Sequence, residues 1–427
     1  STLSSSSAAS DVYKRQLCTI VILSYLFDIS SKYSKIPGVI LLIGLGILLQ
    51  VITESTGFVI PNMQPVLPVI GTLGLILIVM DASLDLKLEK KKARLLQKSV
   101  LSALTLLVLV TALSAIVLIY LFDYSGTAAV LNSIPMGIIS SAVAIPSAGS
   151  LKDREKEFII YESSFSDIFG IMAFDFILFN QGDLSGGIPH YLLLALITII
   201  VAIAVSSGLA MLLHKIKYHI NYIIIMTVMV LVYSLAKMYH LPALLLVLVF
   251  GLTLSNSELG EHTPINRYVD FDKFRKDIDA FKKILGEFTF LVRSFFFIIF
   301  GYYTSLEGIF YPMNLLIAFS FTVGILLIRW LFLWFVLKEK SPSLVLFAPR
   351  GLITILLFIS IPSAYIIPEI NTEVVTLVIL MTMLTMMLGN IISPKSKAVA
   401  ELPETELPEV VPENLPEDEE QERVPMQ

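Results

Sequence analysis

The chain contains one apolar stretch after another, and each is long enough to cross the hydrocarbon core of a membrane, which takes about 20 residues of helix or somewhat fewer. Lipid offers the backbone no hydrogen-bond partners, so segments that are apolar throughout fold as helices there. Of the 427 residues, 56% are hydrophobic and only 15% are charged, whereas soluble domains have about 25% charged residues. The sequence therefore predicts an all-α, polytopic membrane protein and excludes an ordinary soluble globule.

The apolar stretches predict thirteen membrane spans. They lie near residues 17–29, 37–52, 66–83, 99–121, 133–150, 156–180, 190–213, 220–238, 241–256, 285–304, 312–337, 343–366 and 372–392. Lysines and arginines gather in alternate loops between these spans, and the other loops carry only Lys237. Because cytoplasmic loops are enriched in lysine and arginine, this alternation supports the count. It also predicts an N-terminus outside and a C-terminus in the cytoplasm.

The two ends of the chain differ from the transmembrane domain that we expect at residues 17–393. Residues 1–16 are rich in serine and alanine and read as a non-native leader. Residues 394–427 form a tail that has, from Glu401 onward, ten acidic residues, five prolines and one arginine. Such a composition predicts a disordered, acidic and proline-rich cytoplasmic tail. The single cysteine, Cys18, excludes a disulfide framework and a cysteine-rich metal site.

The sixth span carries acids and hydroxyls on one stripe. Glu162 and Ser166 are four residues apart, as are Ser163 and Asp167, so all of them share one face of a helix. Asp167 lies 11 residues beyond Lys156, which is ~16 Å into a core of ~30 Å. A carboxylate at that depth can bind a small cation through oxygen and can take a proton instead. The stripe predicts a cation- and proton-binding site. The alternative, that Asp167 only caps or pairs with a neighbouring helix, stays open.

Three arginines lie within apolar spans rather than in loops, namely Arg293, Arg329 and Arg350. An ionisable group at membrane depth is costly, and its default interpretation is functional. Arg350 lies about as deep as Glu162, and a Glu162–Arg350 ion pair would let the membrane tolerate both charges. Arg329 lies beside Trp330, and we interpret it as a snorkelling or structurally paired side chain as readily as a functional one.

Two spans are interrupted by proline and glycine. The interruptions of the fifth span are Pro135, Gly137, Pro146 and Gly149, and those of the twelfth are Pro342, Pro349-Arg350-Gly351 and Pro362. Proline removes a backbone donor and breaks or kinks a helix. Discontinuous helices near mid-membrane form the ion sites of many secondary transporters, which are built from inverted repeats. We therefore expect two discontinuous helices, with the repeats inside residues 37–180 and 241–366.

One stretch of the sixth span resembles a known motif. Tyr161-Glu162-Ser163-Ser164-Phe165-Ser166-Asp167 is similar to the Gly-Glu-Ser-x-x-Asn-Asp stretch of bacterial sodium/proton exchangers in the monovalent cation/proton antiporter superfamily. This resemblance implies that Asp167 is the essential cation- and proton-binding carboxylate and that Ser163 and Ser166 assist it. It also implies that Glu162 pairs with an arginine on the twelfth helix, and Arg350-Gly351 looks like that arginine motif.

Further segments extend the resemblance over residues 17 to 393. Met80-Asp81-Ala82-Ser83-Leu84 is similar to a segment of the family whose acid lies near the ion path, and Arg293 precedes a stretch that resembles the family's tenth helix. The chain departs from the family at Ala144-Ile145-Pro146, where Thr-Asp-Pro is usual, so a second acid is absent. We expect neutral oxygens to complete the site, either the hydroxyls of Ser140, Ser141 and Ser147 or backbone carbonyls. The departure also suggests an electroneutral one-for-one exchange.

The resemblance implies a secondary active transporter that exchanges a monovalent cation for H⁺ by alternating access and serves pH homeostasis. Na⁺ is the expected cation, and K⁺ and Li⁺ stay open because oxygen ligands suit all three. A homodimer in the bacterial inner membrane is implied, with no cofactor. The alternative is a secondary carrier for a small organic anion that Arg293 and Arg350 would bind. We do not expect an enzyme, because the chain has no HExxH zinc motif and no Gly-x-Gly-Asp setting for an intramembrane aspartyl protease.

Overall fold

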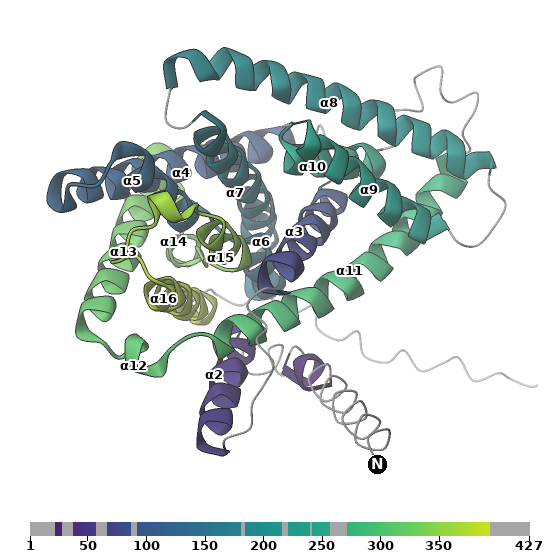
Figure 1. The fold of residues 1–427 in the computed structure, drawn as a ribbon. Helices are drawn as coiled ribbons and strands as arrows, with labels where there is room; N and C mark the ends of the chain where they lie inside the picture. Colours follow the sequence, from purple (N-terminus) through teal and green to yellow (C-terminus); the bar gives the residue numbers. More distant parts are fainter. Residues whose placement is uncertain are drawn as a thin grey trace, which may run out of the picture.

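The computed structural model describes residues 22–27, 37–56, 66–86, 92–180, 184–215, 221–239, 241–256 and 271–392. Every regular element within these ranges is a helix, as Figure 1 shows. The predicted all-α membrane fold is therefore confirmed. The leader at residues 1–16 and the tail at residues 394–427 lie outside the described residues, so both stay predictions.

Seven helices of the described residues are long and apolar enough to cross a membrane. Three shorter apolar helices accompany them, at Val69–Leu84, Tyr222–Met238 and Ala243–Ser255. The predicted sixth span corresponds to a further helix, α7 (Asp153–Asn180), in which acids interrupt the apolar sequence. The chain is thus a multi-pass membrane protein, and the count of thirteen spans stays a prediction.

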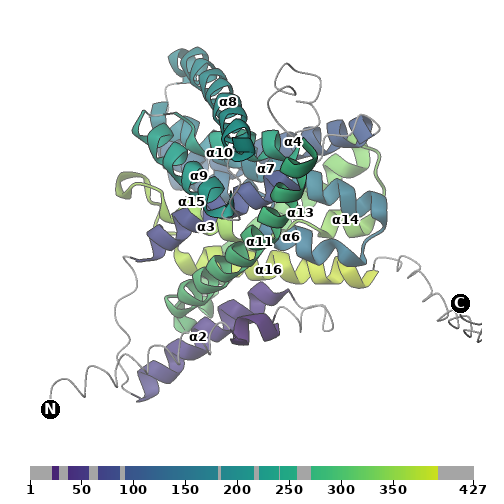
Figure 2. The ribbon, with the colours of Figure 1, turned by 90° about the vertical axis from the view of Figure 1, so that its right-hand side faces the viewer.

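Six helices pack together into what we call the flanking group. They are α2 (Gly38–Thr56), α3 (Val66–Asp85), α8 (Leu184–Lys215), α9 (Asn221–Met238), α10 (Ala243–Ser255) and α11 (Phe271–Tyr302). Helix α11 packs along α2 and α3, while α10 packs against α3, α8 and α9. Figure 2 shows α11 running diagonally through the molecule, with α2 beside it and α8 at one edge.

Glycine lets α2 and α11 touch through their backbones. A Cβ atom added at Gly46 would lie 2.2 Å from the carbonyl oxygen of Ile298, and one added at Gly301 would lie 2.3 Å from that of Ile43. Small residues at helix contacts are a common way to pack helices tightly in membranes. Any larger residue at either position would force the two helices apart.

Helix α11 begins 14 residues before the span predicted at 285–304. The early part of the helix carries lysines and acids that we assigned to a loop, yet Phe274, Ile278, Phe281 and Leu285 are buried. Their spacing of three or four residues places all of them on one face of a helix. An apolar stripe thus continues the helix beyond its uniformly apolar part.

Nine further helices of the described residues form what we call the crossing group. They are α4 (Ala93–Phe122), α5 (Gly126–Gly137), α6 (Ser141–Ser147), α7, α12 (Leu306–Ile309), α13 (Pro312–Leu331), α14 (Pro342–Leu346), α15 (Leu352–Ile359) and α16 (Thr372–Ile392). The group contains the same order twice: a long helix, a broken helix and a second long helix. One copy is α4, α5 with α6, and α7, and the other is α13, α14 with α15, and α16.

The two broken helices meet at their interruptions. The first is interrupted at residues 138–140, between α5 and α6, and the second at residues 347–351, between α14 and α15. The amide nitrogen of Ser140 donates a hydrogen bond of 2.9 Å to the carbonyl oxygen of Pro349. Residue 349 lies in the Pro349-Arg350-Gly351 sequence that predicted a break. Both discontinuous helices are confirmed, and a backbone hydrogen bond joins them.

Of the four residues predicted to interrupt the fifth span, two prolines lie within helices. Pro135 lies within α5, and Pro146 lies within α6 and is exposed. The interruption instead follows Gly137, which is three residues before Ser140. Proline has no amide to donate to the carbonyl four residues before it, and for Pro146 that carbonyl, of Ala142, accepts a hydrogen bond from Arg293 instead. The residues that face the site are therefore Ile139, Ser140 and Ser141.

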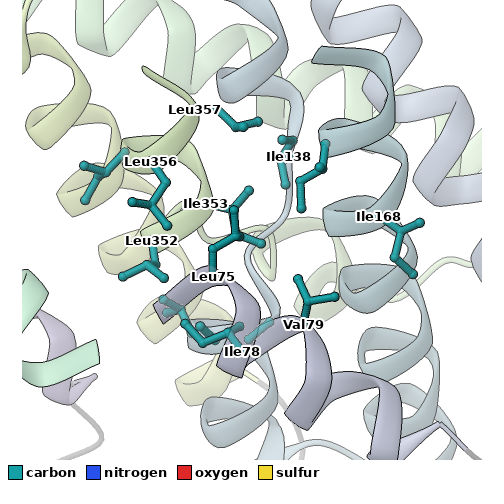
Figure 3. Packing of buried hydrophobic residues seen from close by; sticks show 14 of the residues in the cluster. Leu75, Ile78, Val79, Ile138, Ile168, Leu352, Ile353, Leu356 and Leu357 are labelled. Atoms are coloured by element: carbon teal, nitrogen blue, oxygen red, sulfur yellow. The ribbon is translucent and has the colours of Figure 1, made fainter. Parts of the chain in front are cut away.

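An apolar cluster fills the space between α3 and the broken helices. Figure 3 shows Leu75, Ile78 and Val79 from α3 beside side chains of α15, with Ile138 and Ile168 next to them. The members from α15 are Leu352, Ile353, Leu356 and Leu357. This cluster lies where the flanking group meets the crossing group.

Candidate functional site

Helix α7 supplies hydrogen-bond acceptors to the first interruption. The amide nitrogen of Ile139 donates to Ser166 Oγ at 2.9 Å, and that of Ser141 donates to Asp167 Oδ2 at 3.1 Å. Amides at the start of a helix have no partner within the helix and need one from elsewhere. Ser166 and Asp167 are adjacent in sequence, so one turn of α7 serves two of these amides. The structure thus brings together Ser141, Ser166 and Asp167, as the sequence predicted.

Two buried oxygen atoms beside this contact have no hydrogen-bond partner. They are Asp167 Oδ1 and Ser140 Oγ, in residues that are 4% and 0% exposed. Buried polar atoms are satisfied in most folded proteins, so an exception needs an explanation. A carboxylate oxygen and a hydroxyl oxygen are ligands that suit a small hard cation. These are the atoms of the site that could hold one.

Arg350 caps carbonyl groups at both interruptions. Its Nε donates to the carbonyl oxygen of Met136 at 2.8 Å, and its Nη1 donates to that of Ala348 at 2.8 Å. The last carbonyls of a helix carry partial negative charge, and a cation stabilises them. Met136 lies in the last turn of α5, so the arginine balances the carbonyl end of that half-helix. The amide nitrogen of Arg350 donates to Thr382 Oγ1 of α16 at 3.1 Å.

The predicted ion pair between Glu162 and Arg350 was wrong, because Arg329 pairs with Glu162. Its two terminal nitrogens donate to the two carboxylate oxygens at 2.9 and 2.7 Å. Ser102 of α4 also donates to Glu162, and the Nε of Arg329 donates to the carbonyl oxygen of Leu344 at 2.8 Å. Glu162 and Arg329 are 0% and 1% exposed. The pair therefore joins α4, α7 and α13 in the interior.

A second, more exposed cluster joins the same three elements near one surface. Glu339, which follows α13, accepts hydrogen bonds of 2.7 Å from both Lys98 of α4 and Arg154 of α7. Lys98 lies four residues before Ser102, so the two clusters stack along one face of α4. The chain reaches Glu339 through Lys338, which adopts a left-handed conformation with φ of 57°. Helices α4, α7 and α13 are thus tied together at two depths.

The other predicted residues lie around this centre. Ser163 donates to the carbonyl oxygen of Ile159 in its own helix at 2.8 Å, so the structure does not bring it to the interruption. Arg293 of α11 donates to the carbonyl oxygen of Ala142 at 2.9 Å and therefore links the flanking group to α6. Asp81 is half-buried near the end of α3. Roles for Ser163, Asp81 and Arg293 in transport stay predictions.

Sequence reasoning missed one residue of this centre and misjudged another. Thr382 gave no charge signal, because a hydroxyl in a membrane helix normally bonds within its own helix. Arg329 did give one, since it lies at membrane depth in the eleventh span. The depth of Arg350 also matched Glu162, so depth alone could not decide between two arginines.

Comparison with known proteins gives matches over most of the chain. The family model described as "Sodium/hydrogen exchanger, transmembrane" matches residues 18–395. The structure is similar to that of the sodium proton antiporter MjNhaP1 from Methanocaldococcus jannaschii at pH 8, with a TM-score of 0.62 and 21% identity over 88% of this chain and 94% of that one. A structure of the same antiporter from electron microscopy gives a TM-score of 0.63 and 20% identity over 89% and 94%. No curated protein sequence matches the chain.

Proposed function

The chain belongs to the sodium/hydrogen exchanger family, a family of membrane transporters rather than enzymes, and we propose that Asp167 is the residue at which it exchanges a monovalent cation for H⁺. Na⁺ is the proposed cation, with K⁺ and Li⁺ as the other candidates. The observation that carries this proposal is the half-satisfied carboxylate. One oxygen of Asp167 is held by the amide of Ser141, and the other is buried without a partner, as is the hydroxyl of the preceding residue, Ser140.

The mechanism that we propose is competition for that oxygen. When Asp167 is deprotonated, Oδ1 and the hydroxyl oxygen of Ser140 bind the cation, and when a proton binds instead the cation leaves. The site holds one positive charge in either case, so a cycle that carries a cation one way and a proton the other moves no net charge. The partners of the broken-helix amides other than Asp167 are neutral: Ser166, Thr382 and the carbonyl of Pro349. This supports the electroneutral one-for-one stoichiometry.

Alternating access would come from movement of the crossing group against the flanking group. Glu162, Asp167, Arg329 and Arg350 all belong to the crossing group, and hydrogen bonds tie its helices to one another. Transporters with inverted repeats commonly move one bundle against another around a site of this kind. We further propose a homodimer in the bacterial inner membrane, with the N-terminus outside and the C-terminus in the cytoplasm.

The alternative of an organic-anion carrier has less support. An anion clamp needs arginine donors that are free to bind substrate, yet two donors of Arg350 already bind Met136 and Ala348. Arg293 spends a donor on Ala142 of α6. The unpartnered buried atoms at the interruption are oxygens, Asp167 Oδ1 and Ser140 Oγ, and the carboxylate oxygen would attract a cation.

The test compares two acids of α7 that differ in whether they are paired. Asp167→Asn keeps the shape and an acceptor for Ser141 but removes the charge, so we expect a folded protein that does not exchange ions. Glu162→Gln breaks a buried ion pair, which typically costs about 3–5 kcal/mol of folding stability. We expect this variant to be unstable, and the double variant Glu162→Gln with Arg329→Gln to recover part of the loss.

The measurement is dequenching of a pH-sensitive dye in everted vesicles after addition of Na⁺, K⁺ or Li⁺. Protein yield and thermal unfolding in detergent give the folded fraction of each variant. Asp167→Asn vesicles that respond as fast as the parent would overturn the assignment of the site. A response of the parent to an organic anion, with none to cations, would favour the alternative.

A further inference from the structure

Helices α3 and α15 join the flanking group to the crossing group through a close fit. A Cβ atom added at Gly71 of α3 would lie 2.3 Å from Leu356 Cδ2 of α15. Both residues are buried, and Leu356 is 4% exposed. Gly71 therefore leaves a notch in the surface of α3, and the end of the Leu356 side chain fills it.

The notch lies within an apolar layer. Figure 3 shows Leu75 and Ile78 of α3 facing Ile353 and Leu356 of α15. Ile138 of the first interruption extends the layer to α7. Its side chain fits closely over Gly170, where an added Cβ would lie 2.2 Å from Ile138 Cδ1. Close-packed apolar side chains leave no room for hydrated ions.

The layer lies on the α15 side of the site. The segment that follows α15 lies beside α5, because Asn132 of α5 donates to the carbonyl oxygen of Tyr365. The far end of α6 lies near α16, because Asn390 donates to the carbonyl oxygen of Ser147. Along α15, residues 352–357 are all buried, whereas α6 becomes exposed at Pro146, five residues from the amide that holds Asp167.

We propose that Leu356 and Gly71 form the seal that keeps ions from reaching Asp167 from the α15 side. The seal spans the two helix groups, so it must part when the crossing group moves. Leu356 leaves the notch as the α15 side opens and returns to it as that side closes. This inference rests on the proposed exchange function for its purpose, but its test does not use transport.

The test measures how often the α15 side opens. Val79 is buried on the same helix as Gly71, about two turns further along, so a thiol there is protected while the seal is closed. In a Cys18→Ser background, Val79→Cys is labelled in oriented vesicles by a membrane-impermeant maleimide added on the α15 side. Leu356→Ala leaves a cavity at the contact, and we expect labelling to become about tenfold faster.

Complementary volume changes make the result specific to this contact. Gly71→Ala pushes against Leu356, so we expect faster labelling from this variant as well. In the double variant Gly71→Ala with Leu356→Ala, the added methyl group enters the emptied space, and labelling returns toward the parental rate. Gly74→Ala is the matched control, because an added Cβ there would meet Val292 of α11 at 3.1 Å, within the flanking group. We expect the control to leave labelling unchanged.

Three outcomes would overturn the proposal: unchanged labelling in folded Leu356→Ala protein, no recovery in the double variant, or an effect of Gly74→Ala as large as that of Gly71→Ala. If Leu356→Ala does not fold, Leu356→Val removes less volume and must give a smaller change in the same direction. Labelling is also measured with Asp167→Asn. A seal that behaves as expected while Asp167→Asn still exchanges ions would refute the proposed site and leave the seal standing.

Discussion

Helices α7 and α16 occupy equivalent places in the two copies of the fold, but they offer different side-chain groups to the broken helices. Each is the long helix that follows a broken one, and each offers side-chain oxygens to amides of the interruption. Ser166 and Asp167 of α7 accept from Ile139 and Ser141, while Thr382 of α16 accepts from Arg350.

The contrast separates holding the crossing from binding an ion. A neutral hydroxyl is enough to satisfy a buried amide, as Thr382 shows. The charge of Asp167 is therefore not needed to hold the broken helix, and its second oxygen is left without a partner. Helix α7 has an acid, Asp167, where α16 has the neutral Thr382. We connect this difference to transport.

The change with the largest expected effect removes the amide that holds Asp167. Ser141 is the first residue of α6, where proline fits a helix, and Ser140 already has the extended backbone that proline requires before it, with φ of −75° and ψ of 116°. Ser141→Pro deletes a hydrogen bond to a charged group, which is worth about 1.5–3 kcal/mol. We expect exchange at low cation concentration to fall by about 10- to 100-fold.

Ser141→Ala is its control, because it removes the hydroxyl and keeps the amide. Dye dequenching over a range of Na⁺ concentrations measures both variants. Equal loss in the two variants would mean that the hydroxyl, and not the amide, positions the carboxylate.

The next largest effect is that of pH on exchange. It follows from the carboxylate of Asp167 in α7, which has no counterpart at Thr382 in α16. Protons and cations compete for Asp167, so lowering the pH raises the cation concentration that gives half-maximal exchange. Below the pH at which the site is half protonated, the shift is about tenfold per pH unit, because the cation needs the deprotonated ligand. Thr382→Val is expected to leave this slope unchanged. A slope that changes in Thr382→Val would contradict the division of labour between the two helices.

A smaller effect compares the neutral acceptors of the two helices. Ser166→Ala and Thr382→Val each leave a buried amide without its partner, at a cost of about 1–3 kcal/mol. We expect both to lower the midpoint of thermal unfolding by similar amounts. Ser164→Ala and Thr385→Val are matched controls, because these hydroxyls donate to carbonyls of their own helices. If the two controls lost as much thermal stability as the two test variants, the buried amides would not account for the effect.

The smallest effect concerns the partly exposed ion cluster that fastens α7. Glu339→Gln removes the charge that Lys98 and Arg154 share, and their exposed fractions allow water to compensate. Exposed ion pairs contribute about 1 kcal/mol or less. Thermal unfolding at low and high salt should therefore show a small loss in the variant that salt reduces.

Sequence reasoning predicted the fold and selected Asp167 as the candidate site residue because both inferences depend on strong, local signals. Long apolar stretches predict membrane-spanning helices, and proline and glycine within them predict interruptions. An acid at membrane depth is rare, so Asp167 was easy to recognise. The arginine that pairs with Glu162 could not be found in this way, since the choice between Arg329 and Arg350 depends on which helices are neighbours. The sequence indicated the hydroxyls of Ser140, Ser141 and Ser147 as candidate ligands, but the choice among them also depends on which side chains are neighbours in the fold.

The backbone hydrogen bond between Ser140 and Pro349 has a mechanical consequence. It joins the two broken helices at their interruptions, where each of them lacks the hydrogen bonds of a continuous helix. If one broken helix moved without the other, this hydrogen bond would break, so the bond favours joint movement of the two helices. An ion bound beside this hydrogen bond would therefore move with the crossing group, while the flanking group stays in place.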